Sequence, residues 1–256
     1  MPPRTTRPST RLRAIFFDFG GTLAGALADL GPLYREASIR SGVEVPWDRF
    51  LEEVGRTWKE LWPQAAALVD QTPSFLDLVH HTALERAGAT GPLPTMVREV
   101  RDEALAPKWH PPFPETDEVL RVLRDRGYAL HLLSNNTDWL PRVVQNLGWT
   151  DLFGSITFSQ EVGAEKPDPR SFELALQRAG CVASEALHVG DLWVADYQGA
   201  RKVGMQALWL NRAGTSPPEP CESLRDLRGL LTRLPGPVRD PSEDDPDHRR
   251  QARART

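Results

Sequence analysis

Five short apolar segments rich in β-branched or aromatic residues stand out along the chain. They occupy residues 13–18, 129–134, 155–158, 186–190 and 206–210. Runs of this length and composition are typical of buried strands. A segment with helical periodicity precedes each of the last four of them, at residues 115–126, 140–147, 169–179 and 194–202. Strands that alternate with helices predict a parallel sheet, so the sequence predicts a doubly wound α/β domain.

The interval between the first and second predicted strands has a different pattern. It contains four amphipathic stretches at residues 30–40, 48–61, 74–86 and 95–105, separated by glycines and prolines, and no convincing strand. A helical insert of about 80 residues is too long for a simple crossover. We therefore expect a small helical domain, residues 25–109, over the carboxyl edge of a sheet domain formed by residues 11–24 and 110–234. The tryptophans Trp58 and Trp62 lie four residues apart in this insert, a spacing that favours its core over a ligand platform.

The two ends of the chain lack the apolar residues that a folded segment needs. Residues 1–10 are basic and rich in Pro and Thr, and residues 235–256 mix Pro with both charges. Such segments cannot offset their ordering entropy, so both are predicted to be disordered tails. The start also lacks the apolar stretch of a signal peptide, and no run of about 18 apolar residues is present to span a membrane.

Composition narrows the classes of partner. The chain has 256 residues, of which 40% are hydrophobic, and a formal net charge of −4. This charge gives no general attraction to nucleic acid or anionic lipid, so we expect neither as a partner. The cysteines Cys181 and Cys221 lie in unrelated contexts, which favours a reducing, cytoplasmic compartment over a disulfide framework.

At four places in the chain, polar residues lie where a parallel sheet would expose them, at or just after the end of a predicted strand. They are Asp18, Ser134, Asn135, Lys166, Asp191 and Asp196. One such residue alone is more typical of a helix N-cap than of a catalyst. Because ligands of open α/β sheets bind beyond the carboxyl ends of the strands, the combination instead predicts a functional site.

The order and spacing of these residues closely resemble the haloacid dehalogenase superfamily of hydrolases, which are mostly Mg²⁺-dependent phosphatases. The resemblance rests on an Asp-x-x-Gly-Thr loop at residues 18–22, an apolar run that ends in Ser-Asn, a Lys-Pro pair before a helix, and a Gly-Asp pair followed by a further Asp. It covers about residues 13–23 and 112–210, which include all five predicted strands. The helical insert takes the position of the family's type-1 cap, and the sheet domain would be its Rossmann-like core.

The resemblance assigns roles in phosphoryl transfer. Asp18 would be the nucleophile that attacks phosphorus and forms an aspartyl-phosphate, which divides a difficult hydrolysis into two easier steps. Ser134 and Asn135 would bind the phosphoryl oxygens through hydroxyl and backbone N–H groups, and Lys166 would supply positive charge to the same oxygens. Thr22 would orient the first loop at the substrate, with a structural role as a helix cap as the alternative.

The resemblance also implies a Mg²⁺ site, which suits a carboxylate-rich set of oxygen ligands. Asp191 would be the side-chain ligand, Asp18 would share the ion, and the backbone carbonyl of Gly20 would bind it as well. Asp196 would support either the ligands of the ion or Lys166.

Gly20 departs from the family pattern. Family phosphatases usually carry a second aspartate two residues after the nucleophile, whose carboxylate protonates the leaving oxygen and then activates water. Glycine keeps the backbone carbonyl but loses this acid and base, a function worth about 10² to 10⁴ in rate. We therefore expect metal binding to survive better than turnover.

Three functions remain open on the sequence. The first is a phosphatase of a small phosphorylated metabolite that hydrolyses acyl or aryl phosphates but is slow with alkyl phosphates, whose leaving groups need a proton. The second is a catalytically impaired protein that binds phosphate or a partner. The third is a dehalogenase, whose relatives also lack the second acid but usually replace the metal-binding acid that this chain keeps as Asp191.

Overall fold

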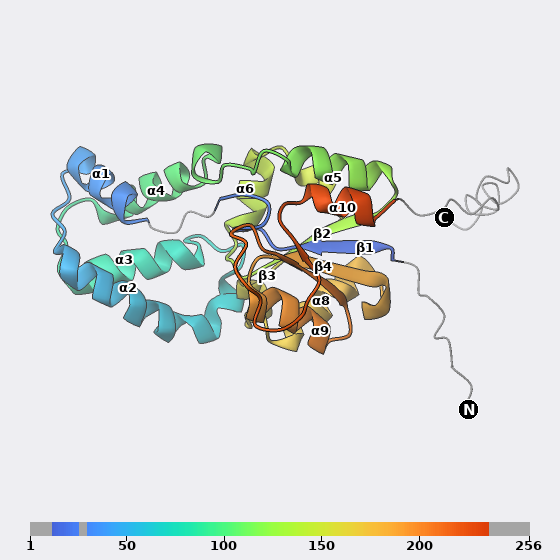
Figure 1. The fold of residues 1–256 in the computed structure, drawn as a ribbon. Coiled ribbons are helices and arrows are strands. Elements are labelled where there is room, and N and C mark those ends of the chain that lie inside the picture. Colours follow the sequence, from blue (N-terminus) through green and yellow to red (C-terminus); the bar gives the residue numbers. More distant parts are fainter. Residues whose placement is uncertain (1–11, 26–29, 236–256) are drawn as a thin grey trace, which may run out of the picture.

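The computed structural model describes residues 12–25 and 30–235. Within these residues, six parallel strands form one sheet in the order β3-β2-β1-β4-β5-β6 (Figure 1). The strands are β1 (Ala14–Phe17), β2 (Ala129–Ser134), β3 (Ser155–Phe158), β4 (Ala186–Gly190), β5 (Gln206–Leu210) and β6 (Ser223–Leu224). The predicted parallel α/β sheet is thus confirmed with all five of its strands, and the two-residue edge strand β6 is an addition that the apolar pattern was too short to indicate.

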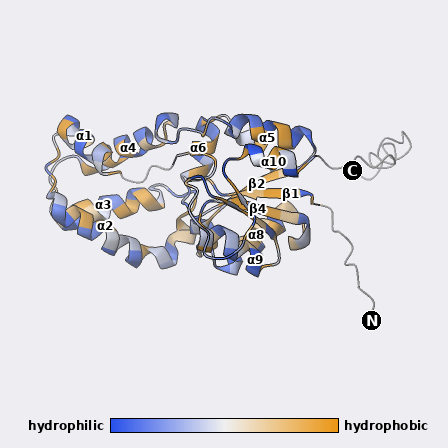
Figure 2. Ribbon diagram, viewed as in Figure 1, coloured by the Kyte–Doolittle hydropathy of each residue, from blue (hydrophilic) through white to orange (hydrophobic). Residues whose placement is uncertain are grey.

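Helices cover both faces of the sheet because successive residues of each strand point to opposite faces. Ile15 and Phe17 of β1 belong to the larger buried cluster, which includes residues of the helices α5 (Thr116–Asp125) and α10 (Arg228–Arg233). Ala14 and Phe16 belong to a separate cluster with α8 (Pro169–Ala179) and α9 (Gly199–Lys202). Figure 1 shows these two helix pairs on opposite sides of the strands. In Figure 2 the central strands are almost wholly hydrophobic, as expected for a parallel sheet buried on both faces.

Shorter helices complete the sheet domain. They are α6 (Leu140–Asn146), α7 (Ser159–Val162) and the 3₁₀ turns at Thr150–Leu152 and Ala183–Glu185, while a further 3₁₀ turn at Pro107–Trp109 ends the insert. The predicted helix at residues 194–202 begins instead as a π-helical turn, Trp193–Gln198, and continues as α9. A π-helical turn inside a helix often marks a functional site, and this one carries Asp196.

The insert forms a helical cap beyond the carboxyl ends of the strands (Figure 1). Its helices are α1 (Gly31–Ser41), α2 (Trp47–Leu61), α3 (Phe75–Ala87) and α4 (Leu93–Ala104), with a 3₁₀ segment at Trp62–Leu68. Ser74 caps α3 in a reciprocal arrangement with Asp77, since each side chain accepts a hydrogen bond from the other residue's backbone N–H. The four predicted cap helices are all present, and none of their ends differs from the prediction by more than two residues.

Two antiparallel chain segments join the cap to the sheet domain. Gly25 donates its backbone N–H to the carbonyl of Pro111, and Phe113 donates its own to the carbonyl of Leu23. Side chains also link the two parts, since Gln160 donates to the carbonyl of Ala65 at 3.1 Å. The cap therefore docks on the sheet domain through paired linkers and buried polar contacts.

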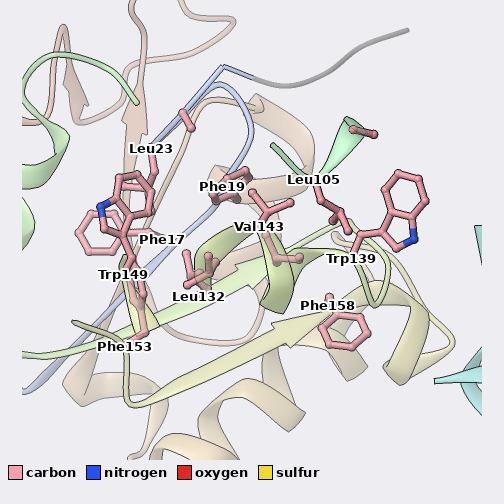
Figure 3. Packing of buried hydrophobic residues seen from close by; sticks show 14 of the residues in the cluster. Phe17, Phe19, Leu23, Leu105, Leu132, Trp139, Val143, Trp149, Phe153 and Phe158 are labelled. Atoms are coloured by element: carbon pink, nitrogen blue, oxygen red, sulfur yellow. The ribbon is translucent and has the colours of Figure 1, made fainter. Parts of the chain in front are cut away.

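Apolar packing continues across the same junction. Leu105 of the cap lies in one buried cluster with Trp139 and Val143 of the sheet domain (Figure 3). Both predicted tails lie outside the described residues, apart from Pro235. Among the described helices, none has the length and apolarity needed to cross a membrane.

Candidate functional site

Asp18 lies at the point where the strand order of the sheet reverses. β1 pairs with β2 on one side and with β4 on the other, so the chain first builds one half of the sheet from β1 and later returns to the other side of β1 as β4. Asp18 follows β1 directly, and its backbone N–H donates to the carbonyl of Val189 in β4 at 2.9 Å. The residue is only 6% exposed. The topology thus places this carboxylate at the switch point where open α/β sheets bind ligands.

Lys166 is held beside Asp18 by three acceptors. Its ammonium donates to Asp18 Oδ1 at 2.8 Å, to Asp196 Oδ1 at 2.5 Å and to the carbonyl of Leu133 at 2.8 Å. These bonds use all three N–H groups of a lysine. Burial disfavours the charged ammonium, but the two carboxylates outweigh this effect and raise the pKa of Lys166. A fixed positive charge therefore stands next to the candidate nucleophile.

Ser134 and Asn135 lie at the end of β2 as predicted, but their side chains do different things. Ser134 is 4% exposed and lines the cavity described below, and its hydroxyl lowers the pKa of Asp18. Asn135 brackets the backbone of Lys166, since its Oδ1 accepts from the Lys166 N–H at 2.7 Å and its Nδ2 donates to the Lys166 carbonyl at 3.0 Å. The Asn135 side chain thus positions the lysine, which leaves its backbone N–H for the predicted contact with a phosphoryl group.

Asp191 approaches the first loop from the end of β4. The Thr22 hydroxyl donates to Asp191 Oδ1 at 3.2 Å. Gly21 has a φ of +78°, and a Cβ there would lie 2.5 Å from Asp191 Oδ2, so only glycine fits this close approach. Thr22 is fully buried and is not among the described residues that line the cavity. Its placement favours a role in orienting Asp191 over the predicted contact with substrate.

Asp196 is the centre of a buried polar network. One oxygen accepts from Lys166 and from His188 Nε2, the latter at 2.9 Å, and the other accepts from the backbone N–H of Leu192 at 2.9 Å. Burial would raise the pKa of Asp196, but Lys166 and His188 hold it well below its usual range. Of the two roles left open for Asp196, this geometry favours the support of Lys166. A Cβ at Gly190 would collide with the Asp196 carboxyl group, so the Gly-Asp pair of the motif has a steric reason.

Two supporting residues were missed on the sequence. His188 lies in the middle of β4 and reads as a strand residue, and burial lowers its pKa. Arg212 donates to the carbonyl of Thr22 at 2.8 Å and to Glu115 at 2.7 Å, which fixes the first loop from behind. Neither carried a local signal, because each acts on a residue distant in the chain.

The carboxylates of the site suit a divalent cation. Ligand atoms of Asp18, Asp191 and Asp196 lie within 4.8 Å of one another. Three carboxylates against one ammonium leave an excess of two negative charges, and burial together with Asp18 raises the pKa of Asp191 to about 6. Burial also raises the pKa of Asp18, which Lys166 opposes. A hard divalent cation would offset the excess negative charge and stabilise the ionised form of both buried carboxylates, so the donor set fits Mg²⁺.

A cavity of about 410 Å³ opens above Asp18 between the sheet domain and the cap. Asp18, Gly20, Ser134, Asn135 and Lys166 all line it, so the structure brings most of the predicted site residues together. This volume falls in the range of small-molecule sites. Gly20 contributes no side chain to the cavity, whose described lining holds two other titratable side chains besides Asp18 and Lys166, those of His110 and Glu165.

Further lining residues were not expected. Thr137 is buried, and its hydroxyl has no partner among the described residues. His110 donates from Nε2 to the carbonyl of Ala104 at 2.9 Å, and its Nδ1 has no partner within the described part of the chain. Trp58 lines the cavity while it stacks on Trp62, with ring centroids 5.5 Å apart. Trp58 therefore packs in the cap core, as predicted, and also faces the cavity.

Comparison with known proteins identifies the class to which this fold and site belong. The model of the haloacid dehalogenase-like hydrolases matches residues 12–204, so the chain belongs to this family, and the resemblance seen in the sequence is confirmed.

Individual relatives share most of their length with the chain. It is 35% identical over 230 residues to a phosphoserine phosphatase of Thermus thermophilus, covering 84% of this chain and 87% of the relative. It is 28% identical to a glyceraldehyde 3-phosphate phosphatase of Methanothermobacter thermautotrophicus, covering 78% and 86%. Among solved structures, it resembles a 2-haloacid dehalogenase of Pseudomonas syringae with a TM-score of 0.69 and 26% identity, covering 87% and 99% of the two chains.

Proposed function

We propose that this protein is a Mg²⁺-dependent phosphatase that hydrolyses a small phosphorylated metabolite through an aspartyl-phosphate on Asp18. The observation that carries the proposal is the contact of 2.8 Å between Lys166 and Asp18 at the floor of the cavity, with Asp191 close by. The phosphatase names of two relatives that match most of the chain support the same class.

The residues divide the work as follows. Lys166 orients the Asp18 carboxylate and places a positive charge beside the phosphoryl group, while Ser134 and the backbone N–H of Asn135 hold the phosphoryl oxygens. Asp18, Asp191 and the Gly20 carbonyl would hold Mg²⁺, which supplies positive charge against the charge of the phosphoryl group. In this way the buried carboxylate attacks a dianion that it would otherwise repel.

The test is hydrolysis of phenyl phosphate with and without Mg²⁺, in the native protein and in Asp18→Asn. We expect Mg²⁺-dependent release of phosphate by the native protein, a phosphorylated peptide containing Asp18 after acid quenching, and neither in the variant. Turnover that persists in Asp18→Asn or in the presence of a chelator would overturn the proposal.

Two other functions have an observation in their favour. Gly20 leaves the cavity without the usual acid, which fits a protein that binds phosphate but does not turn it over; Mg²⁺-dependent binding of inorganic phosphate without hydrolysis of any aryl phosphate would select this function. The similarity to a dehalogenase structure fits carbon–halogen hydrolysis, but Asp191 beside Asp18 would have no purpose there. Magnesium-independent halide release from a 2-haloacid would select it.

A further inference from the structure

The cavity has two chemically different walls. The polar lining residues, such as Ser134, Asn135 and Thr137, belong to the sheet domain. The cap contributes Leu30, Trp58, Leu76 and Ala104, all of which are apolar apart from the indole N–H of Trp58. The sheet domain adds further apolar surface through Phe19, Trp139 and Val143. A phosphoryl group at Asp18 would therefore direct the rest of its ester toward an apolar wall.

The aromatic part of this wall is fixed by packing. The Trp58 ring stacks on Trp62 with an interplanar angle of 14°. It also packs edge-to-face with Phe75, with ring centroids 5.0 Å apart. Trp139, only 8% exposed, donates its indole N–H to the Ser74 hydroxyl at 3.3 Å. Rigid indole rings in the lining of a cavity offer flat surfaces that prefer another aromatic ring.

The charges in the cavity also favour an ester whose leaving group is uncharged. Among the described lining residues there is one lysine and no arginine, and that lysine, Lys166, is already bound by Asp18 and Asp196. A carboxylate on the leaving group would have to leave water without a cationic partner, and it would meet the carboxylate of Glu165 in the lining. Both effects disfavour leaving groups that carry a carboxylate.

The absence of a side chain at Gly20 is an independent observation with the same consequence. Without a proton donor at this position, the leaving oxygen must depart as an anion. A phenolate is a far more stable anion than an alkoxide, because its charge is delocalised over the ring. The missing acid therefore costs least when the ester oxygen is attached to an aromatic ring.

We propose, on the basis of the phosphatase function above, that the substrates are phosphate monoesters of phenols whose ring is uncharged and lies against the apolar cap wall formed by Leu30, Trp58, Leu76 and Ala104. An Asp18 oxygen forms a bond to phosphorus while the bond to the aryl oxygen breaks, and the electron pair leaves with the phenolate. The phenolate takes a proton from solvent water. Water then hydrolyses the aspartyl-phosphate to hydrogen phosphate and the Asp18 carboxylate. This hydrolysis releases one proton to solvent.

The first test compares kcat/KM for three esters in the presence of Mg²⁺: phenyl phosphate, 4-carboxyphenyl phosphate and O-phosphoserine. The first two have leaving groups of similar acidity and differ mainly by one charge. We expect phenyl phosphate to exceed 4-carboxyphenyl phosphate by about tenfold or more, since the wall offers the carboxylate no cation, and to exceed O-phosphoserine by more. Faster hydrolysis of either charged ester would overturn this inference and leave the phosphatase function standing, whereas no hydrolysis of any of the three would overturn the phosphatase function itself.

The second test places a cation in the wall. Leu76→Arg should shift the ratio of the two aryl esters toward 4-carboxyphenyl phosphate by about tenfold. Leu51→Arg is the matched control, because Leu51 lies on α2, is 57% exposed and is not part of the described lining; it should leave the ratio unchanged. Trp58→Arg introduces the charge from α2 and serves if Leu76→Arg does not fold. An unchanged ratio in a folded cavity variant would show that the cap wall does not select the ester.

Discussion

Replacing Gly20 by aspartate should restore the missing proton donor. Gly20 lines the cavity with Asp18, whereas the left-handed conformation and the close approach to Asp191 belong to Gly21. Gly20 is not among the glycines with a positive φ, so a side chain at position 20 does not carry the backbone strain that one at position 21 would cause.

The expected magnitude follows from the charges already present. A second carboxylate about 5 Å from Asp18 would be raised in energy by about 3 kcal/mol at an effective dielectric constant of about 20, or roughly two pKa units. Such a shift brings an aspartate toward neutral pH, where it can donate a proton to the leaving oxygen. We expect hydrolysis of alkyl phosphates to rise by about 10² to 10⁴, which corresponds to roughly 3 to 5 kcal/mol of barrier, and hydrolysis of phenyl phosphate to rise much less in its first step.

The assay is single-turnover kinetics of an alkyl and an aryl phosphate with saturating Mg²⁺, which separates attack on phosphorus from the later hydrolysis of the aspartyl-phosphate. Gly20→Asn is the matched control, because it adds nearly the same volume but no acid. If Gly20→Asp gives no gain over Gly20→Asn with the alkyl ester, another group already supplies the proton, and the reasoning about this loop fails. His110→Gln and Glu165→Gln would then show whether either of the two remaining titratable lining residues is that group.

Four further changes test the rest of the site and the cap. Asp18→Asn should lower aryl phosphate turnover by about 10³-fold or more, as expected for a lost nucleophile, with the fold checked by circular dichroism. Asp191→Asn should raise the Mg²⁺ concentration for half-maximal activity by about tenfold or more, because it removes a charged oxygen ligand; an unchanged Mg²⁺ dependence would place the ion elsewhere. Gly21→Ala should lower the free energy of unfolding by about 1 kcal/mol or more through its left-handed φ of +78°, measured by urea titration. Burial lowers the pKa of His80 to about 4 against the opposing charge of Asp77, so above pH 6.5 its contribution to stability is fully present, and as pH falls from 6.5 through 4 the free energy of unfolding should fall by up to about 3 kcal/mol; His80→Phe should flatten this dependence between pH 7 and pH 4.

The fold was predictable because its signals are local. Each of the strands β1 to β5 is a short, mainly apolar run, and the central strands β1 and β4 are buried along their whole length, so no information from distant residues was needed to find them. The location of Asp18 in the site could be predicted as well, because parallel strands bring their carboxyl ends to one edge of the sheet, where ligands bind. The helical insert was likewise visible from its length and its glycine and proline boundaries.

The parts that escaped prediction depend on contacts between distant segments. His188 reads as an ordinary strand residue, and its contact with Asp196 depends on the π-helical turn that follows β4. Arg212 reaches across the sheet edge to the carbonyl of Thr22, 190 positions away in the chain. For Asn135 the sequence predicted only a contact of the backbone N–H with a phosphoryl group, whereas its side chain holds the backbone of Lys166. In each case the side-chain type was visible, but its partner was not.

The sequence by itself determined the fold class, the order of the motifs and the absence of a second acid at Gly20, because these are properties of residue type and spacing. Only the tertiary structure decided that Trp58 faces the cavity as well as the cap core, and that the cap side of the cavity is apolar. The physical reason is that a helix with hydrophobic residues on more than one face can bury any of them, and which face meets Asp18 depends on how the cap docks against the sheet.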